Sequence, residues 1–272
     1  MEIDLSYMTE KFEKRLDHRE DRYDRERSKK EKRSDDYKTL EEVFDKPTLM
    51  TIYHLMNTGI LSSLAGILNA GKEARVYLGY TPSEEEVAVK IYLTSSAEFK
   101  KGMMMYIDGD PRFSHVKRDT RSLIYTWAMK EYRNLKGAYD AGVRVPKPIK
   151  VLKNVLVMEF IGREESPASL LRENPPKDIG RVYASLMRYA RALYGKAGLV
   201  HSDLSEYNVM IYKGKPIIFD MAQSVSIDHP RAKEFLLRDL TNLEKYFIHM
   251  NVETKSLDEA YRYVTGEYLR VA

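Results

Sequence analysis

The sequence contains no cysteine, which excludes disulfide bonds and thiolate zinc sites and leaves the redox compartment unspecified. It also has no signal-peptide-like segment and no apolar run long enough to cross a bilayer. We therefore expect a soluble, cytoplasmic protein. A chain of 272 residues with 43% hydrophobic content can bury a sizeable core, and its length fits two lobes better than one.

Charge is unevenly distributed along the chain. Residues 1–47 carry 13 Lys and Arg against 15 Asp and Glu, out of totals of 45 and 41, so the remainder has a formal excess of +6. Such an excess fits a polyanionic ligand or partner such as ATP or RNA, and it equally fits a moderately basic surface without a partner. The mixed charges of 11–38 indicate a solvated helix or a disordered arm, with RNA docking as the alternative.

The most informative stretch joins His201, Asp203 and Asn208 in the H-x-D-x-x-x-x-N spacing that protein kinases use for a catalytic loop. A short turn and a hydrophobic run then lead to Asp220. In this arrangement Asp203 can orient or accept the proton of an attacking hydroxyl. Asn208 and Asp220 can supply oxygen ligands to a Mg²⁺ ion that bridges nucleotide phosphates.

A glycine-rich segment precedes the first clear strand. Gly66, Gly71 and Lys72 nearly match the phosphate-binding pattern G-x-x-x-x-G-K-[ST], but Glu73 stands where the metal-binding hydroxyl belongs. Residues 75–78 also indicate a strand where that motif requires a helix. We therefore predict a hairpin that covers a nucleotide, as in kinases, with an ordinary β-hairpin as the alternative.

Residues 86–92 alternate as a strand and resemble the V-A-I-K element of kinases, which places Ala88 and Lys90 on one face. The helix predicted over 119–140 has an apolar stripe that contains its only glutamate, Glu131. A buried carboxylate is costly unless it is paired, so we expect Glu131 to pair with Lys90. The alternatives are a solvated strand lysine and a glutamate at the edge of the stripe.

Segment 94–118 between these two elements is too long for a plain connection, and we expect a mobile or functional loop. It contains Ser95, Ser96 and Ser114, which are candidate autophosphorylation sites. Residues 146–152 and 155–162 read as two strands. In a kinase layout, the second strand places Met158 behind the adenine, and the backbone of Glu159 to Ile161 meets the adenine edge. A buried strand without a ligand fits the same hydrophobic pattern.

Further helices are predicted near the first and last parts of the folded region. A helix begins near Thr48, the candidate cap, and a second follows Asp178. A third has Pro230 in its first turn, and a short one covers 256–264. The resulting division is a charged arm over 1–47, an N-lobe over 48–157, a hinge over 158–162 and a C-lobe over 163–272. The expected fold is α+β, bilobal and protein-kinase-like, with a small β-rich N-lobe and a reduced, mostly helical C-lobe.

With these parts assembled, the chain resembles the RIO family of atypical serine kinases, in particular its type-one branch. The resemblance runs from about Leu49 to the C-terminus. It depends on the segments 71–74, 89–95, 109–113, 127–135, 200–208 and 219–225. No winged-helix segment precedes the core, which disfavours the type-two branch.

The resemblance implies an autophosphorylating ATP-dependent kinase or ATPase that acts in maturation of the small ribosomal subunit, with a precursor of that subunit as partner. Asp220 is then a candidate for transient phosphorylation. The implied cofactors are ATP and Mg²⁺, with Mn²⁺ as an alternative. The residues implied to bind the nucleotide are Lys72, Glu73, Ala74, Val76, Ala88, Lys90, Glu131, Met158, Glu159, Ile161 and Met210; Lys90, Asp203 and Asp220 form the catalytic set, and Asn208 and Asp220 hold the metal.

Several positions differ from ordinary protein kinases. Ser202 replaces the arginine before the catalytic aspartate, and Ser205 replaces the lysine two residues after it. Asn69 and Ala70 replace the Ser-Thr that usually precedes Gly71 in the family. The chain after Asp220 is too short for an activation segment and a peptide-docking lobe, which disfavours generic protein substrates.

Two other classes of function fit parts of the pattern. A small-molecule phosphotransferase of the aminoglycoside-kinase type shares the His-x-Asp loop, but it requires an acceptor pocket built by a larger C-terminal lobe. A non-catalytic RNA- or ribosome-binding scaffold requires no intact Asp203.

Overall fold

The computed structural model describes residues 44–94, 97–113, 117 and 119–269. Ser95, Ser96 and Ser114 lie outside these residues, as does most of the charged segment 1–47. The chain divides into two compact units, residues 1–53 and 54–272. No helix in the described ranges combines the length and apolar character that a membrane span requires.

The described part of the first unit is the start of helix α2 (Lys46–Asn57), which continues past the division at residue 53. The Asp45 carboxylate caps this helix, because its Oδ1 accepts from the Thr48 N–H at 3.1 Å. The helix thus begins two residues before Thr48, the residue that the sequence indicated as its cap. The predicted boundary between 47 and 48 therefore falls within a helix.

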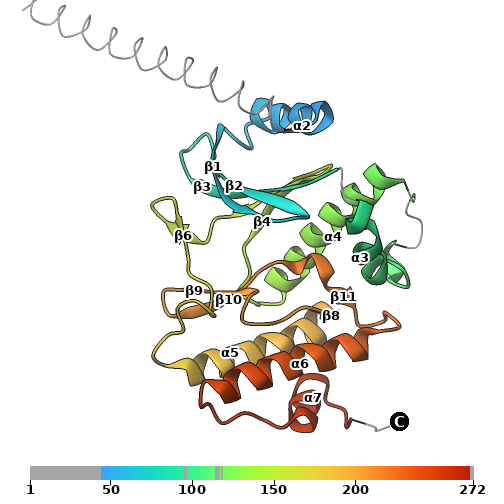
Figure 1. Cartoon of the computed structure of the whole chain (residues 1–272), viewed down its shortest axis with the longest axis vertical. Helices are drawn as coiled ribbons and strands as arrows, with labels where there is room; N and C mark the ends of the chain where they lie inside the picture. Colours follow the sequence, from blue (N-terminus) through green and yellow to red (C-terminus); the bar gives the residue numbers. More distant parts are fainter. Residues whose placement is uncertain (1–43, 95–96, 114–116, 118, 270–272) are drawn as a thin grey trace, which may run out of the picture. The chain divides into compact units, whose positions relative to one another are not determined.

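The second unit contains a five-stranded antiparallel sheet in the order β1-β2-β3-β5-β4 (Figure 1). Its strands are β1 (Ser63–Ala70), β2 (Ala74–Tyr80), β3 (Glu86–Tyr92), β4 (Pro148–Leu152) and β5 (Val155–Glu159). Gly71 closes the β1–β2 hairpin by donating its N–H to Ala74 O at 3.0 Å. A strand thus follows Lys72, which confirms the hairpin and rules out a phosphate-binding loop that opens a helix.

Helix α4 (Thr120–Asp140) lies against the sheet, and Asp119 caps its first turn by accepting from the Ser122 N–H. The predicted stripe is confirmed, because Ile124, Ala128, Leu135 and Ala138 are all completely buried. A 21-residue helix with an apolar stripe needs a covering surface on that side, which the sheet and the neighbouring elements provide.

The segment between β3 and α4, for which we expected a mobile or functional loop, folds in part into regular structure. It contains helix α3 (Ala97–Ile107) and the 3₁₀ turn η1 (Pro111–Phe113). Met103, Tyr106 and Ile107 are buried at helical spacing, and the Tyr106 ring contacts Trp127 of α4, with centroids 6.1 Å apart. These apolar positions make the segment part of the core and explain why it folds as a helix.

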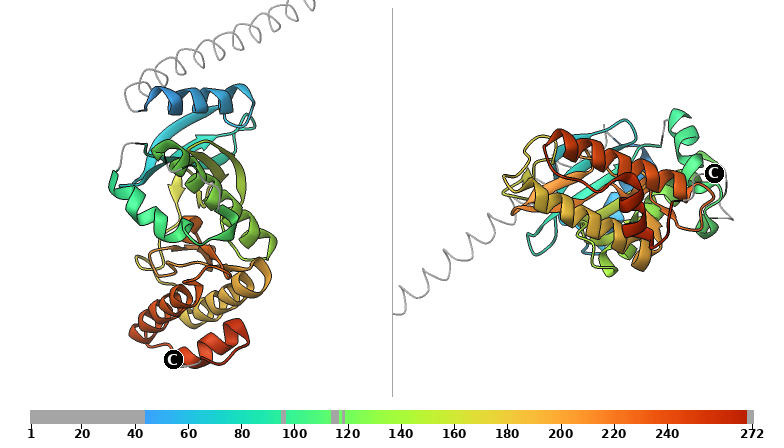
Figure 2. Two further views of the ribbon diagram at one scale, coloured as in Figure 1. Left: turned by 90° about the vertical axis from the view of Figure 1, so that its right-hand side faces the viewer. Right: turned by 90° about the horizontal axis from the view of Figure 1, so that it is seen from below.

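The lower half of the second unit is mostly helical, as predicted (Figure 2). Helix α5 (Ile179–Ala192) is capped by Asp178 and continues into a π-helical turn, η2 (Leu193–Ala197), which ends at Gly198. Helix α6 (Ala232–His249) packs beside α5, and α7 (Leu257–Thr265) packs on both. Ser256 starts α7 with a reciprocal capping box with Glu259.

Short elements carry the polar loops between the sheet and these helices. They are β6 (Gly162–Arg163), β7 (Ser166–Pro167), β8 (Leu199–Val200), β9 (Val209–Tyr212), β10 (Lys215–Ile218), η3 (Met221–Gln223) and β11 (Val225–Ser226). The pairs β6–β7, β8–β11 and β9–β10 are antiparallel. The β8–β9 connection and the turn after β10 are thereby held close together.

Candidate active site

Lys90 lies at the centre of the site. Its Nζ is 2.8 Å from Glu131 Oε1 and 2.8 Å from Asp220 Oδ1, although Asp220 is 130 positions away in the sequence. Lys90 and Glu131 are buried. Burial opposes the charge of Lys90, but the carboxylates of Asp220 and Glu131 outweigh it and raise the pKa of Lys90 above its usual value. The ammonium group is therefore charged at neutral pH.

The ion pair predicted between Lys90 and Glu131 is present. Glu131 lies on the buried stripe of α4, between Ala128 and Leu135, and Lys90 on β3 reaches it. The Tyr92 hydroxyl also donates to Glu131, through Oε2. Burial raises the pKa of Glu131, and the positive charge of Lys90 counteracts this rise. Glu131 thus has a partner for each carboxylate oxygen.

Asp203 and Asn208 face each other across the β8–β9 loop. Asn208 Nδ2 donates to the Asp203 backbone oxygen at 2.8 Å and to its carboxylate Oδ2 at 2.9 Å. Partial burial raises the pKa of Asp203, and the Asn208 hydrogen bond counteracts the rise. Because its amide nitrogen is engaged, Asn208 retains its amide oxygen as the atom suited to a metal ion.

Asp220 occupies the left-handed region, with φ 57° and ψ 63°. A residue other than glycine is uncommon there, although aspartate tolerates it better than most. Partial burial acts to raise the pKa of its carboxyl group, but Lys90 outweighs this effect and lowers the pKa below its usual range. Asp220 is therefore an ionised carboxylate at the mouth of the site, with 45% of its side chain exposed.

Asp239 was not singled out in the sequence. It lies on the buried face of α6, where its Oδ2 accepts from the Ser202 N–H and its Oδ1 from the Leu204 N–H, both at 2.8 Å. These two bonds hold the backbone on either side of Asp203. The available signal was an acidic residue on an apolar helical stripe, next to Leu240 and Leu236. Burial raises the pKa of Asp239 to about 7, against the effect of the two N–H donors.

His201 also supports the loop from inside. Its side chain is buried, and Nε2 lies 3.2 Å from Phe219 O, which places the ring proton on that nitrogen. Within the described part of the chain, Nδ1 has no hydrogen-bond partner. Burial lowers the pKa of His201 to about 4, so the ring is neutral at physiological pH.

The residues predicted to line the nucleotide site occupy the sheet and its hairpin. In the β2–β3 register, Val76 pairs with Lys90, and in the β3–β5 register, Ala88 pairs with Met158. Ala74 and Ala88 are buried, and Val76, Met158 and Met210 are half-buried, with Met210 across the site on β9.

The hairpin turn adds charged groups with different surroundings. Glu73 is exposed on the surface. The pKa of its carboxyl group is nevertheless raised, mainly by partial loss of solvent and also by the negative charges of Asp220 and Asp203. Glu73 therefore faces the same space as Lys90 and the two aspartates. Lys72 is exposed and forms no ion pair with any residue that the structure describes.

The predicted hinge is anchored by the side chain of Glu159. Arg144 binds it through two bonds, from Nη1 to Oε2 at 2.8 Å and from Nη2 to Oε1 at 2.6 Å. The Glu159 N–H donates to Lys147 O, and the Ile161 oxygen accepts from the Ala168 N–H. Among the described residues, no acceptor binds the Ile161 N–H, so that group is the hinge donor suited to a ligand.

The sequence matches the RIO domain family over residues 75–260. Two archaeal relatives are named RIO-type serine/threonine-protein kinase Rio1. That of Haloferax volcanii is 39% identical, with 87% of this chain and 80% of the relative covered. That of Methanocaldococcus jannaschii is 38% identical, with 96% and 88% covered. Human serine/threonine-protein kinase RIO1 is 38% identical, but the match spans only 41% of its length.

The solved structure of the Rio2 kinase from Chaetomium thermophilum resembles this chain with a TM-score of 0.63 and 23% identity, over 80% of this chain and 68% of that one. The fold is therefore that of a bilobal kinase, α+β as predicted. The protein belongs to the RIO family of serine/threonine protein kinases, and the resemblance to the type-one branch is confirmed by the relatives named Rio1.

We predict that Lys90→Met destabilises the protein by about 3–5 kcal/mol, because Glu131 becomes a buried charge without its cation. The double variant Lys90→Met/Glu131→Gln should recover most of this loss, since the amide is neutral and still accepts from Tyr92. Urea unfolding measures the free energy of unfolding of the single and the double variant. As a control, Lys136→Met breaks the exposed pair with Asp140 and should cost about 0–1 kcal/mol. A double variant as unstable as the single one would contradict the assignment.

His201 gives a pH-dependent prediction. Its pKa is about 4 in the folded protein, against 6.5 ordinarily, so the unfolded chain binds more protons between these values. The contribution of the neutral ring is fully present above pH 6.5 and is lost as pH falls towards 4. The difference in unfolding free energy between wild type and His201→Gln should therefore shrink by roughly 1 kcal/mol per pH unit in this window. A constant difference from pH 7 to pH 4.5 would argue against the buried neutral ring.

Proposed function

We propose that the protein transfers the γ-phosphoryl group of ATP, with Asp203 as the group that orients or accepts the proton of the attacking hydroxyl. The observation that carries this proposal is the position of the Lys90 ammonium, 2.8 Å from both Glu131 and Asp220. In kinases the equivalent lysine pairs with nucleotide phosphates and with a helix glutamate. Lys90 is assigned to the phosphates, and Glu131 holds it in place.

The residues present fit a magnesium ion. Mg²⁺ binds oxygen ligands and typically takes one or two carboxylates together with substrate phosphates. Asp220 offers a half-exposed ionised carboxylate, and Asn208 an amide oxygen. When bound, the ion neutralises the charge of the phosphate oxygens. Ala74, Val76, Ala88, Met158 and Met210 are assigned to the adenine and ribose, the Ile161 N–H to the adenine edge, and Lys72 and Glu73 to the phosphate cover.

Asp203 is prepared for its role by its neighbours. Asn208 fixes its carboxylate, and Asp239 fixes the backbone on either side of it. A base held in this way removes the hydroxyl proton as the bond to phosphorus forms and the bond to the leaving ADP oxygen breaks. The raised pKa of Asp203 makes it a better proton acceptor than an ordinary aspartate.

The short segment after Asp220 limits which groups can accept the phosphoryl group. Only residues 221–231 separate Asp220 from α6, too few for a long activation segment. This supports self-phosphorylation on serine, for which Ser95, Ser96 and Ser114 are candidates, or ATP hydrolysis. A Chaetomium thermophilum Rio2 structure, 22% identical with a TM-score of 0.61, is described as an ADP/Mg²⁺-phosphoaspartate complex. Asp220 is accordingly a further candidate acceptor.

We further propose that the activity serves maturation of the small ribosomal subunit in the cytoplasm. The family relationship and the +6 excess of charge beyond residue 47 support a polyanionic partner such as the RNA of a subunit precursor. Incubation with γ-labelled ATP, Mg²⁺ and purified small-subunit precursors tests this role. Label release or transfer that is insensitive to the precursors would count against it.

The phosphoryl-transfer assignment predicts that Asp203→Ala lowers γ-phosphoryl transfer or release by at least ~10²-fold, the scale expected for a positioned base. Retention of label on the protein and release of free phosphate are measured in parallel. Asp140→Asn is the matched control, because that aspartate is exposed and pairs with Lys136. Equal turnover in wild type and Asp203→Ala would reject the enzyme assignment and favour a scaffold role.

A further inference from the structure

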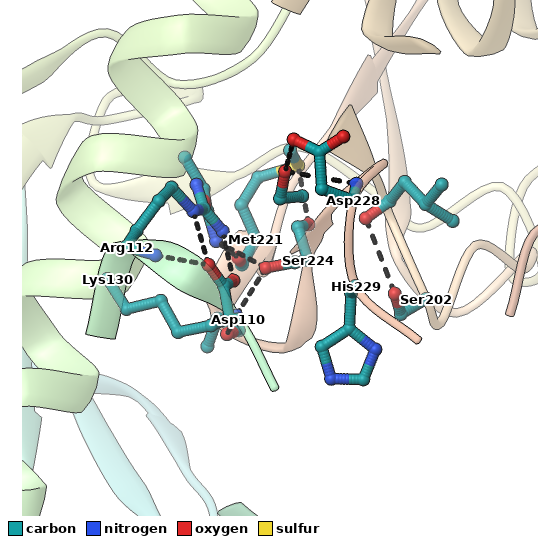
Figure 3. A network of polar contacts seen from close by, with 12 residues as sticks. Asp110, Arg112, Lys130, Ser202, Met221, Ser224, Asp228 and His229 are labelled. Carbon is teal, nitrogen blue, oxygen red and sulfur yellow. Dashed lines mark hydrogen bonds and ion pairs between the residues drawn. The ribbon is translucent and has the colours of Figure 1, made fainter. Parts of the chain in front are cut away.

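A second polar cluster lies directly behind the site, where three segments distant in sequence meet (Figure 3). Lys130 and Asn134 come from α4, Asp110 and Arg112 lie at η1, and the backbone of 221–224 is the turn that follows Asp220. Lys130 and Asn134 are completely buried. A buried polar group is costly unless it forms hydrogen bonds, so the hydrogen-bond partners of Lys130 and Asn134 indicate what these side chains do.

The partners of both side chains are backbone carbonyls of the turn after Asp220. Lys130 Nζ donates to Ala222 O at 2.9 Å and to Ser224 O. Asn134 Nδ2 donates to Met221 O at 2.8 Å and to Ser224 O at 2.9 Å. A short 3₁₀ turn such as η3 leaves carbonyls without helical partners, and here α4 supplies the missing donors.

The charge state of Lys130 does not limit this role. Burial lowers its pKa to about 7, and Arg112 adds to the lowering, whereas Asp110 and Glu131 oppose it. His201 and His229 are further titratable groups near it on other elements. Both the amine and the ammonium form carry enough hydrogens to donate to the Ala222 and Ser224 oxygens.

Arg112 determines the orientation of the Asn134 amide. Its Nη1 donates to Asn134 Oδ1 at 2.8 Å, and since a guanidinium group only donates, the amide oxygen must face it and Nδ2 must face the turn. Asp110, whose side chain is fully buried, holds Arg112 through bonds of 2.9 Å to Nε and 2.7 Å to Nη2. The segment before α4 thus acts on the turn through Asn134.

This segment is also attached to the chain beyond the turn. The Asp108 oxygen lies 3.0 Å from His229 Nε2. Gly109, at φ +87°, lies so close to Pro230 that an added Cβ would stand 2.8 Å from its Cδ atom. The residues that precede η1 are therefore held against the residues that precede α6.

One helix consequently supports both partners of Lys90. Glu131 binds Lys90 directly, and its neighbours Lys130 and Asn134 hold the turn that begins at Asp220. Asp220 itself has a left-handed backbone, a conformation that persists only where the surroundings enforce it. In ordinary protein kinases the corresponding arrangement depends on a phosphorylated activation segment.

We propose that Lys130 and Asn134, supported by the Asp110–Arg112 pair, are positioning residues that hold the Asp220 carboxylate in its metal-binding place. This inference deepens the proposed function and rests on it. The network makes the assembled arrangement of Lys90, Glu131 and Asp220 permanent, so no modification of the chain after Asp220 is required to form it. The segment between β3 and α4 is assigned the role of its outer support.

The primary test uses Lys130→Met, which keeps the length of the side chain and removes its donor group. Amide hydrogen exchange followed by mass spectrometry should show at least ~10-fold faster exchange in 219–226, with α5 unchanged. The Mg²⁺ concentration for half-maximal label transfer from γ-labelled ATP should rise at least ~10-fold, whereas binding of metal-free ADP, measured by calorimetry, should change less than ~2-fold.

A milder variant, Asp110→Asn/Arg112→Gln, removes both charges of the outer pair and leaves no buried carboxylate unpaired. It should shift the same quantities in the same direction by ~3-fold, and it decides the question if Lys130→Met does not fold. Ile124→Ala is the matched control, because it creates a cavity on the same helix and removes no hydrogen bond to the turn. Its Mg²⁺ response should equal that of wild type despite lower thermal stability.

The outcomes separate this inference from the function on which it rests. A wild type that neither transfers nor releases label overturns the proposed function and this inference together. An active wild type whose variants keep the same exchange in 219–226, or the same Mg²⁺ response, overturns the positioning role alone. A control that shifts the Mg²⁺ response as much as the variants would show a general effect of stability and would also overturn it.

Discussion

A positively charged side chain buried between two carboxylates is the constraint on which the structure depends. Removing the Lys90 ammonium from water costs free energy unless acidic partners surround it, and the two partners come from different parts of the chain. Glu131 arrives on a helix and Asp220 on a turn. The sheet, α4 and the β10–η3 turn must therefore keep fixed relative positions for any of the three charges to be satisfied.

Helix α4 meets this requirement with two neighbouring faces. Its apolar stripe packs against the sheet, and Glu131, which lies on this stripe, extends to Lys90. One residue away, Lys130 directs its amine to the carbonyls behind Asp220. Because successive residues on a helix point about 100° apart, one turn of α4 can contact the sheet and the turn after Asp220 at once. The helix thus connects the two halves of the site.

The segment between Asp220 and α6 is short, which makes its support by α4 important. The residues between Asp220 and α6 form a tight turn, a two-residue strand and a helix start. They cannot form a long regulated segment or a broad surface for a peptide. The buried donors on α4 and the segment between β3 and α4 stabilise the turn instead. The matched region is 41% of the human relative, whereas it is 80% and 88% of the two archaeal ones.

Local chemistry made much of this molecule predictable. The alternation of 86–92 indicated β3, the spacing of apolar residues indicated α4, α5 and α6, and the cost of a buried carboxylate predicted the partner of Glu131. Periodicity was less informative for 94–118, because the apolar residues 103–107 of α3 form a continuous run that shows no helical period. The start of α2 was misplaced because Asp45, not Thr48, caps it.

By itself the sequence determined which residue types face the core and which polar side chains demand a partner, because these follow from period and burial cost. Only the tertiary structure decided that Asp239 holds the backbone around Asp203 and that Lys130 and Asn134 hold the turn after Asp220. Their acceptors and donors are backbone groups, which every residue carries. The sequence therefore does not indicate which backbone group a given side chain will bind.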